Sequence, residues 1–250
     1  MQRFVHQEFF SYLCIQLAPS LPEEQKSFED MALLEVCTGS LQSVINAVEG
    51  GAQRIELCSA LALDGLTPSV GLVRLVRERF PQLKIHVLIR PREGDFVYSH
   101  SELRQMAYDI SAVLPYADGI VLGALTHQGD IDLMAMRALM TATEGKPVTF
   151  HRAFDVCRQP LVALEQVIQL GCKRLLTSGQ APTALQGTDM LRRLVDLAHE
   201  RLIIMPGGGV GPANVHQILQ LTAATEIHGS CSAGQGVTST DIVRQTLAAL

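Results

Sequence analysis

Two short stretches of the sequence repeat one chemical pattern. Positions 34–37 read Leu-Glu-Val-Cys and positions 55–58 read Ile-Glu-Leu-Cys, so that apolar residues alternate with a carboxylate and a thiol. In a β-strand, alternate side chains share a face, so each stretch places its carboxylate and its thiol together. Thiolates suit copper(I), although buried cysteine also serves as a small apolar core residue. The repeat therefore places Glu35 with Cys37 and Glu56 with Cys58 on one face, and Cys37 with Cys58 is a candidate pair of ligands for copper(I) if the two strands are neighbours in register.

Other apolar stretches also carry polar residues at alternate positions. In a barrel of parallel strands the outer face packs on helices and is apolar, so the polar residues between the apolar ones point inward. This inward set comprises His86, Arg90, His151, Glu226 and His228. Buried polar and charged groups must pair with one another or serve a ligand. The interior of the barrel is therefore the expected place for function.

Two interpretations of this inward set stay open. In the first, the residues pair with one another and need no ligand: Arg90 forms ion pairs with Glu35 and Glu56, and the histidines donate to Glu226. In the second, the set is an enzyme site, where Glu35 or Glu56 is the general base, His151 is the general acid and Arg90 holds an anionic group.

Glycine-rich turns follow the sixth and seventh expected strands. Backbone N–H groups at such turns can bind a phosphate group at the mouth of a barrel. The residues expected to bind an anion there are Ser178, Gly179, Gly207, Gly208 and Gly209. A tight turn that needs positive φ is the structural alternative.

Arginines and aspartates lie in the loops after the third and fifth expected strands. Arg92 belongs to the first of these loops, and Arg152 and Asp155 belong to the second. Arginine can bind a carboxylate or a phosphate in a bidentate manner, which predicts an anion-binding mouth. Ion pairs between loops that only shape the rim would explain the same residues.

Eight apolar strand patterns alternate with eight amphipathic helix patterns, which is typical of parallel βα units. Strands are expected at about 32–37, 53–58, 84–90, 118–123, 147–151, 173–177, 202–206 and 225–229. Helices are expected at about 40–50, 69–80, 101–115, 131–143, 159–170, 187–199, 211–221 and 239–249. This count predicts an α/β fold, namely a single-domain (β/α)8 TIM barrel, and favours it over a doubly wound open sheet. The absence of a GxGxxG motif after the first strand also favours the barrel.

Composition narrows the classes of partner. The net charge of −5, without a cluster of Lys and Arg, disfavours nucleic acid and anionic membranes. We find no apolar run of the roughly 18 residues that a membrane span needs. Six cysteines without a CxxC motif favour a reducing cytoplasm over a disulfide framework. A small molecule or a metal ion is the expected partner, and no organic cofactor is indicated.

Residues 1–30 differ in character from the remainder. They end in an acidic, polar run before strand-like sequence begins at Ala32. We expect 1–30 to be a poorly ordered extension and 31–250 to be the barrel domain, with Met31 as an alternative start.

The motifs together resemble the CutC family. They are LEVC (34–37), RIELCS (54–59), GLTPS (65–69), IRPREGDFVYS (89–99), TFHRAFD (149–155), LTSG (176–179) and PGGG (206–209). The resemblance covers nearly all of positions 32–228 in collinear order. It implies a TIM barrel, a cytosolic location, a homodimer and an association with copper homeostasis, with copper(I) binding linked to Cys37 and Cys58. It implies no established enzymatic activity.

Two functions therefore remain as hypotheses. One is a copper(I)-binding protein of copper homeostasis. The other is an enzyme that acts on a small anionic or phosphorylated polyol or sugar at the C-terminal mouth of the barrel. The family resemblance favours the first, and the number of polar residues inside the barrel favours the second.

Because the strand pattern begins only after the polar run, the chain without residues 1–30 should fold. A protein that begins at Met31 is expected to keep the far-UV circular dichroism and the urea midpoint of the full chain. Failure of the shortened chain to fold would show that the first thirty residues belong to the domain.

Overall fold

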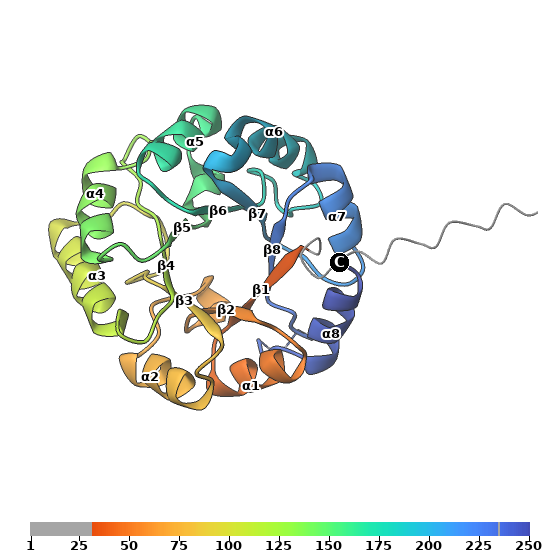
Figure 1. Ribbon diagram of the computed structural model, residues 1–250. Coiled ribbons are helices and arrows are strands. Elements are labelled where there is room, and N and C mark those ends of the chain that lie inside the picture. Colours follow the sequence, from red (N-terminus) through yellow and green to blue (C-terminus); the bar gives the residue numbers. More distant parts are fainter. Residues whose placement is uncertain (1–31, 235) are drawn as a thin grey trace, which may run out of the picture. The chain divides into compact units, whose positions relative to one another are not determined.

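The computed structural model describes residues 32–234 and 236–250, and residues 32–250 form one compact unit. Eight strands stand at its centre and eight α-helices surround them (Figure 1). The strands are β1 (Leu33–Thr38), β2 (Arg54–Leu57), β3 (Lys84–Leu88), β4 (Gly119–Leu122), β5 (Val148–Phe150), β6 (Arg174–Thr177), β7 (Ile203–Pro206) and β8 (Glu226–Gly229). The helices are α1 (Leu41–Glu49), α2 (Val70–Arg79), α3 (His100–Val113), α4 (Leu133–Ala142), α5 (Pro160–Gln169), α6 (Thr188–Ala198), α7 (Val215–Thr222) and α8 (Thr240–Ala248). Three short 3-10 helices are η1 (Leu61–Leu63), η2 (Arg152–Val156) and η3 (His199–Arg201).

Every paired strand runs parallel to its neighbour. The order is β7-β6-β5-β4-β3-β2-β1-β8, so each strand lies beside the next one in sequence and β8 returns to β1. A single bridge between Gly207 and His228 joins the two ends of the sheet. The predicted (β/α)8 TIM barrel is confirmed, and all eight predicted strands and helices are present with shifts of a few residues at their ends.

The two faces of the strands carry different chemistry. Outward residues, such as Val36 on β1 and Ile55 on β2, belong to the large apolar cluster between strands and helices. A second, small cluster inside the barrel contains Cys37, Cys58, Leu88 and Val121. This separation confirms the predicted facing of β1, β2 and β3.

The expected extension at residues 1–30 lies outside the described residues. Among residues 32–234 and 236–250, no helix combines the length and the apolar content that crossing a membrane requires.

The loop from β3 to α3 is anchored at its far end by a capping box. Ser99 Oγ accepts a hydrogen bond from the backbone N–H of Glu102, and Glu102 Oε2 accepts one from the backbone N–H of Ser99 at 2.7 Å. Both bonds satisfy N–H groups that the first turn of a helix leaves without partners.

Replacing Ser99 by alanine should therefore lower the free energy of unfolding by about 0.5–2 kcal/mol. Urea unfolding followed by circular dichroism measures the change. Ser111→Ala is the matched control, because Ser111 lies on the exposed side of the same helix and bonds only to Ala107 O, one turn back. Equal losses for the two variants would contradict a capping role for Ser99.

Candidate functional site

A fully buried carboxylate, Glu35 on β1, lies at the centre of the barrel interior. Its Oε1 lies 3.0 Å from His228 Nδ1 on β8. Its Oε2 lies 2.7 Å from Arg54 Nε and 2.8 Å from His86 Nδ1. The contact with Arg54 is an ion pair, and in neither of these last two contacts is the N–H direction aligned for hydrogen bonding. Nitrogen atoms from β2, β3 and β8 thus surround one carboxylate on β1.

A second carboxylate, Glu226 on β8, continues this network. Arg54 Nη2 makes a short ion pair with Glu226 Oε2, and Arg174 Nε from β6 lies 2.6 Å from the same oxygen. Arg174 Nη2 donates to Glu226 Oε1 at 3.0 Å. Negative and positive groups therefore alternate from Glu35 through Arg54 and Glu226 to Arg174, and we call these residues with His86 and His228 the lumen network.

The pKa values reflect this pairing. Burial opposes ionisation of Glu35, but its contacts with His228 and His86 hold its pKa well below the ordinary value. Burial likewise opposes ionisation of Glu226, and its two arginines bring its pKa below the ordinary value. Although burial opposes the charged form of His228, hydrogen bonds with Cys37 and Glu35 raise its pKa well above the ordinary value. The charged form of His228 is therefore favoured by its neighbours.

The network differs from the one expected. Arg90 was expected to pair with Glu35 and Glu56, and the histidines with Glu226. Instead, Arg54 is the arginine that pairs with Glu35, and both His86 and His228 contact Glu35 and not Glu226. Arg90 donates to three backbone carbonyls, of Leu63 at 2.9 Å, Gly65 at 3.1 Å and Gly94 at 3.0 Å.

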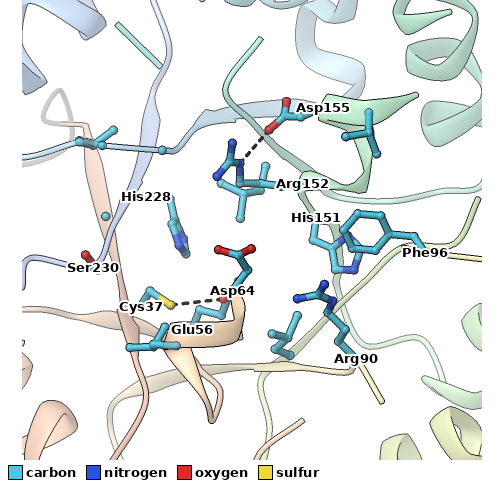
Figure 2. Close-up of a pocket in the computed structure, with 18 of the residues that line it drawn as sticks. Cys37, Glu56, Asp64, Arg90, Phe96, His151, Arg152, Asp155, His228 and Ser230 are labelled. Atoms are coloured by element: carbon cyan, nitrogen blue, oxygen red, sulfur yellow. Dashed lines mark hydrogen bonds and ion pairs between the residues drawn. The ribbon is translucent and has the colours of Figure 1, made fainter. Parts of the chain in front are cut away.

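A cavity of about 510 Å³ lies at the C-terminal ends of the strands. Figure 2 shows Cys37, Glu56 and His228 on one side of it and Arg90, His151 and Phe96 on the other. Of the predicted site residues, the cavity is lined by Cys37, Glu56, Arg90, His151, Arg152, Asp155, Gly208, Gly209 and His228. The structure thus brings nine of the expected residues to one space.

The two thiols meet at the side of this cavity. Cys37 Sγ lies 3.8 Å from Cys58 Sγ and donates to Glu56 Oε1 at 3.5 Å, and Cys58 Sγ donates to Thr38 O at 3.5 Å. The hydrogen bond with Cys58, burial and the charge of Glu56 raise the pKa of Cys37 well above the ordinary value. Cys37, Glu56 and Cys58 each offer one ligand atom, all within 4.8 Å of one another. Three ligand atoms at these distances can bind one metal ion.

Glu56 differs from the two paired glutamates. Burial raises its pKa, against the opposing charge of His228. Its Oε1 accepts from Cys37, while its buried Oε2 has no hydrogen-bond partner among the described residues. One oxygen of this buried carboxyl group therefore has hydrogen-bonding capacity that the described residues do not use.

His151, which follows β5, faces the same space from the opposite side. Its Nδ1 accepts a hydrogen bond from the backbone N–H of Ala153 at 3.2 Å, so the proton of the neutral ring lies on Nε2. Burial and the charge of Arg90 lower its pKa to about 3. The buried Nε2 has no partner within the described chain, and the ring packs on Phe96 at 5.0 Å between centroids. His151 is a neutral hydrogen-bond donor at neutral pH.

Two glycines associated with β4 make room for the histidines on either side. A Cβ atom at Gly119 would lie 2.6 Å from His86 Cδ2, and one at Gly123 would lie 2.7 Å from His151 Nδ1. Any other residue type would displace the imidazole rings. Both glycines share the inward face with Val121, so this signal was present in the sequence alternation, but we did not predict it.

The remaining predicted anion ligands are arranged unequally. Arg152 Nε lies 2.7 Å from Asp155 Oδ2, and Arg152 Nη2 donates to Ser178 Oγ at 3.2 Å. Ser178 Oγ also lies 2.9 Å from Asp155 Oδ2 and 2.6 Å from Ala181 O, and Gly179 lies against Gly187. Arg92 lies away from the cavity and bonds to Asp95, Glu102 and carbonyls of its own loop. Ser178, Gly179, Gly207 and Arg92 do not line the cavity.

Three charged residues of the site were not anticipated. Arg54 and Arg174 complete the lumen network, and Asp64, after η1, lines the cavity. Arg54 lies two positions before Glu56, so the alternation that identified Glu56 also places Arg54 inside. Asp64 lies in a connection whose path the strand pattern does not specify.

Fold and site together define a class: a TIM barrel with a buried ionic network below a polar cavity that contains a thiol pair. Residues 32–233 match the CutC family model, and the chain belongs to the CutC family. A copper homeostasis protein cutC homolog of Homo sapiens is 47% identical over 202 residues, which cover 80% of this chain and 73% of that one. A CutC family protein of Bacteroides fragilis is 48% identical over 199 residues, 79% of each chain.

A solved structure agrees with this assignment. The crystal structure of a CutC protein from Streptococcus agalactiae superposes with a TM-score of 0.77 at 35% identity. It covers 80% of this chain and 99% of that one.

Arg54 separates two buried carboxylates, so replacing it with methionine should be strongly destabilising. We expect Arg54→Met to lower the free energy of unfolding by about 3–5 kcal/mol at pH 8, because Glu35 and Glu226 lose a charged partner. Arg174→Met is the matched control. It should lower the free energy of unfolding by a smaller amount, because Glu226 keeps its ion pair with Arg54.

The pH dependence provides a second measurement of the same change. In the wild type the two carboxylates have lowered pKa values, so their stabilisation is complete above about pH 5 and is lost as the pH falls. In Arg54→Met, Glu35 and Glu226 have lost one positive partner, so protonation of these carboxylates stabilises the folded state of the variant. The difference in the free energy of unfolding between Arg54→Met and the wild type should therefore become smaller from pH 8 to pH 5. Chemical denaturation at each pH measures it, and a difference that does not change with pH would contradict the ionic role of Arg54.

Proposed function

We propose that this protein binds copper(I) in the barrel, through Cys37 and Cys58, and serves copper homeostasis in the cytoplasm. The observation that carries the proposal is the distance of 3.8 Å between the two sulfur atoms, of which Cys37 lines the cavity and Cys58 is fully buried beside it. A metal–thiolate bond is about 2.3 Å long, so one ion can contact both sulfur atoms. The name of the human relative, a copper homeostasis protein, supports the same function.

The donor set suits a soft ion. Thiolates select copper(I) over the hard ions magnesium and calcium, which prefer several oxygen ligands. Glu56 offers the third ligand atom of the group. Both sulfurs are buried, with Cys37 8% and Cys58 0% exposed, so the site limits access of water and oxidants while Cys37 faces the cavity.

The state of the cysteines agrees with a reducing compartment. Cys37, Cys58, Cys157, Cys172 and Cys231 are all free thiols. Cys172 lies in the outer apolar cluster, where burial raises its pKa to about 12. It therefore serves packing, whereas Cys37 and Cys58 lie beside the carboxylate of Glu56.

The variant Cys37→Ser/Cys58→Ser tests the site. We expect its copper(I) affinity to fall by about 100-fold or more, because even changes beyond the direct ligands cost roughly 10- to 100-fold. Competition with bicinchoninate under anaerobic conditions measures the affinity.

Cys172→Ser is the matched control and should bind copper(I) as the wild type does. If the double variant also binds as tightly as the wild type, the metal lies elsewhere and the proposed site is wrong.

A further inference from the structure

The two thiols differ in their access to the cavity. Cys37 lines the cavity and is 8% exposed, whereas Cys58 is fully buried and is not part of the cavity wall. The strands that carry them, β1 and β2, are each paired on both sides, so neither can move without breaking the sheet. An ion that is to contact both sulfur atoms therefore needs a covering element that moves.

The connection after β2 covers the thiols. Leu61, the first residue of η1, packs on the small inner cluster that contains both of them. Gly65 lies directly on the second thiol: a Cβ atom at Gly65 would lie 3.6 Å from Cys58 Cβ and 3.7 Å from Cys58 Sγ. We call residues 60–65, which include Leu61 and Gly65, the gate segment.

The gate segment is a loop on a paired base. The N–H of Ser59 donates to Leu66 O at 2.9 Å, and the N–H of Leu66 donates to Ser59 O at 2.8 Å. Ala60 and Asp64, on either side of η1, have φ angles of 49° and 60°, so the chain turns sharply at both ends of the 3-10 helix. The segment can therefore move as a unit while its base stays paired.

One side chain connects the gate segment to the remaining barrel. Arg90 Nη1 donates to Leu63 O at 2.9 Å and to Gly65 O at 3.1 Å, while Arg90 Nη2 donates to Gly94 O at 3.0 Å. Among residues 32–234 and 236–250, the two bonds of Nη1 are the only hydrogen bonds between residues 60–65 and a residue outside 59–66. The closed position thus depends on these bonds and on the packing of Leu61.

We propose that the gate segment opens to admit a metal ion to the thiol pair and closes over it. Leu61 is the residue that limits access, and Arg90 is the residue that holds the closed position. The opening follows from the contacts of the segment, whereas its consequence for copper rests on the function proposed above.

The closed gate also favours one class of ion. The side chains of Leu61, Leu88 and Val121 surround the thiols with apolar groups, which offer no hydrogen bonds to water carried by an ion. Magnesium gives up its water reluctantly, whereas thiolates select a soft ion such as copper(I). The enclosure therefore excludes hydrated hard ions.

The first test labels the thiols of the metal-free protein with iodoacetamide. The reaction is quenched at intervals, and mass spectrometry of peptides gives the labelling rate of each cysteine. We expect Leu61→Ala to label at Cys58 about 10-fold faster than the wild type, because the contacts of a partly buried leucine shift an opening equilibrium by about that factor. Equal rates at Cys58 in the two proteins would overturn the proposal.

Two controls separate opening of the gate from a general loss of stability. Leu63→Ala makes the same change in the same 3-10 helix, but Leu63 is 41% exposed and belongs to neither apolar cluster, so Cys58 should label as in the wild type. Cys172 lies in the outer apolar cluster, and its labelling should not change in Leu61→Ala. Equal acceleration at Cys58 and Cys172 would indicate global unfolding and would overturn the proposal.

Arg90→Lys tests the hydrogen bonds that hold the segment closed. Lysine keeps the positive charge, but its single ammonium group cannot reproduce the planar fork of the guanidinium. We expect labelling of Cys58 to rise by about 10-fold, as for loss of a hydrogen bond to a charged group, with Cys172 unchanged. Arg158→Lys, which changes an exposed ion pair with Asp130, is the matched control and should label as the wild type does. A wild-type rate in Arg90→Lys would overturn the role of Arg90.

Release of copper tests the consequence for the metal. The rate at which copper(I) passes from the loaded protein to excess bicinchoninate should rise in Leu61→Ala by about the factor seen for labelling of Cys58, because the ion leaves through the same opening. Faster labelling with an unchanged rate of release would show that the gate does not control the metal. Failure of the thiol site is a separate result, since Cys37→Ser/Cys58→Ser would then keep the wild-type affinity whatever the labelling rates are.

Discussion

The ionisation of Glu35 inside the barrel is the interaction on which the remaining site depends. A fully buried carboxylate is tolerated only with close partners, and this one has Arg54 on β2, His86 on β3 and His228 on β8. Because each partner is placed by the register of β1 with β2 and β8 and of β2 with β3, the ionic network and the strand pairing support each other. The cost of burying charge is the reason that stability alone does not explain this interior.

The network also determines which polar groups remain available. Glu35 and Glu226 are neutralised by arginines and histidines below the cavity, so neither presents an unpaired oxygen to it. Glu56 lies two positions along β2 from Arg54, and its Oε2 has no hydrogen-bond partner among the described residues. The charge of His228 opposes the rise that burial causes in the pKa of Glu56. The unpartnered oxygen beside the thiol pair is therefore one that the network does not neutralise.

Strand alternation predicted most of this arrangement, because the face of each residue follows from its position along a strand. It predicted the barrel, the inward direction of Glu35, Cys37 and Glu56, and their nearness to His228. It did not predict which arginine would pair with Glu35. Arg90 follows the end of β3, where its long side chain reaches the carbonyls of two loops, whereas Arg54 begins β2 beside Glu35. Which arginine pairs with Glu35 depends on the position of each arginine along the barrel axis, and the alternation of side chains along a strand does not specify that position.

Glu56 connects the thiol pair with the charged interior of the barrel. Its Oε1 accepts a hydrogen bond from Cys37, and its buried Oε2 has no hydrogen-bond partner among the described residues. Burial raises the pKa of this carboxyl, so its ionised form is costly without a positive partner. A metal ion held by the thiols would supply that partner, because a nearby cation favours the ionised carboxylate. The proposed copper(I) site and the buried charge at Glu56 would therefore stabilise each other.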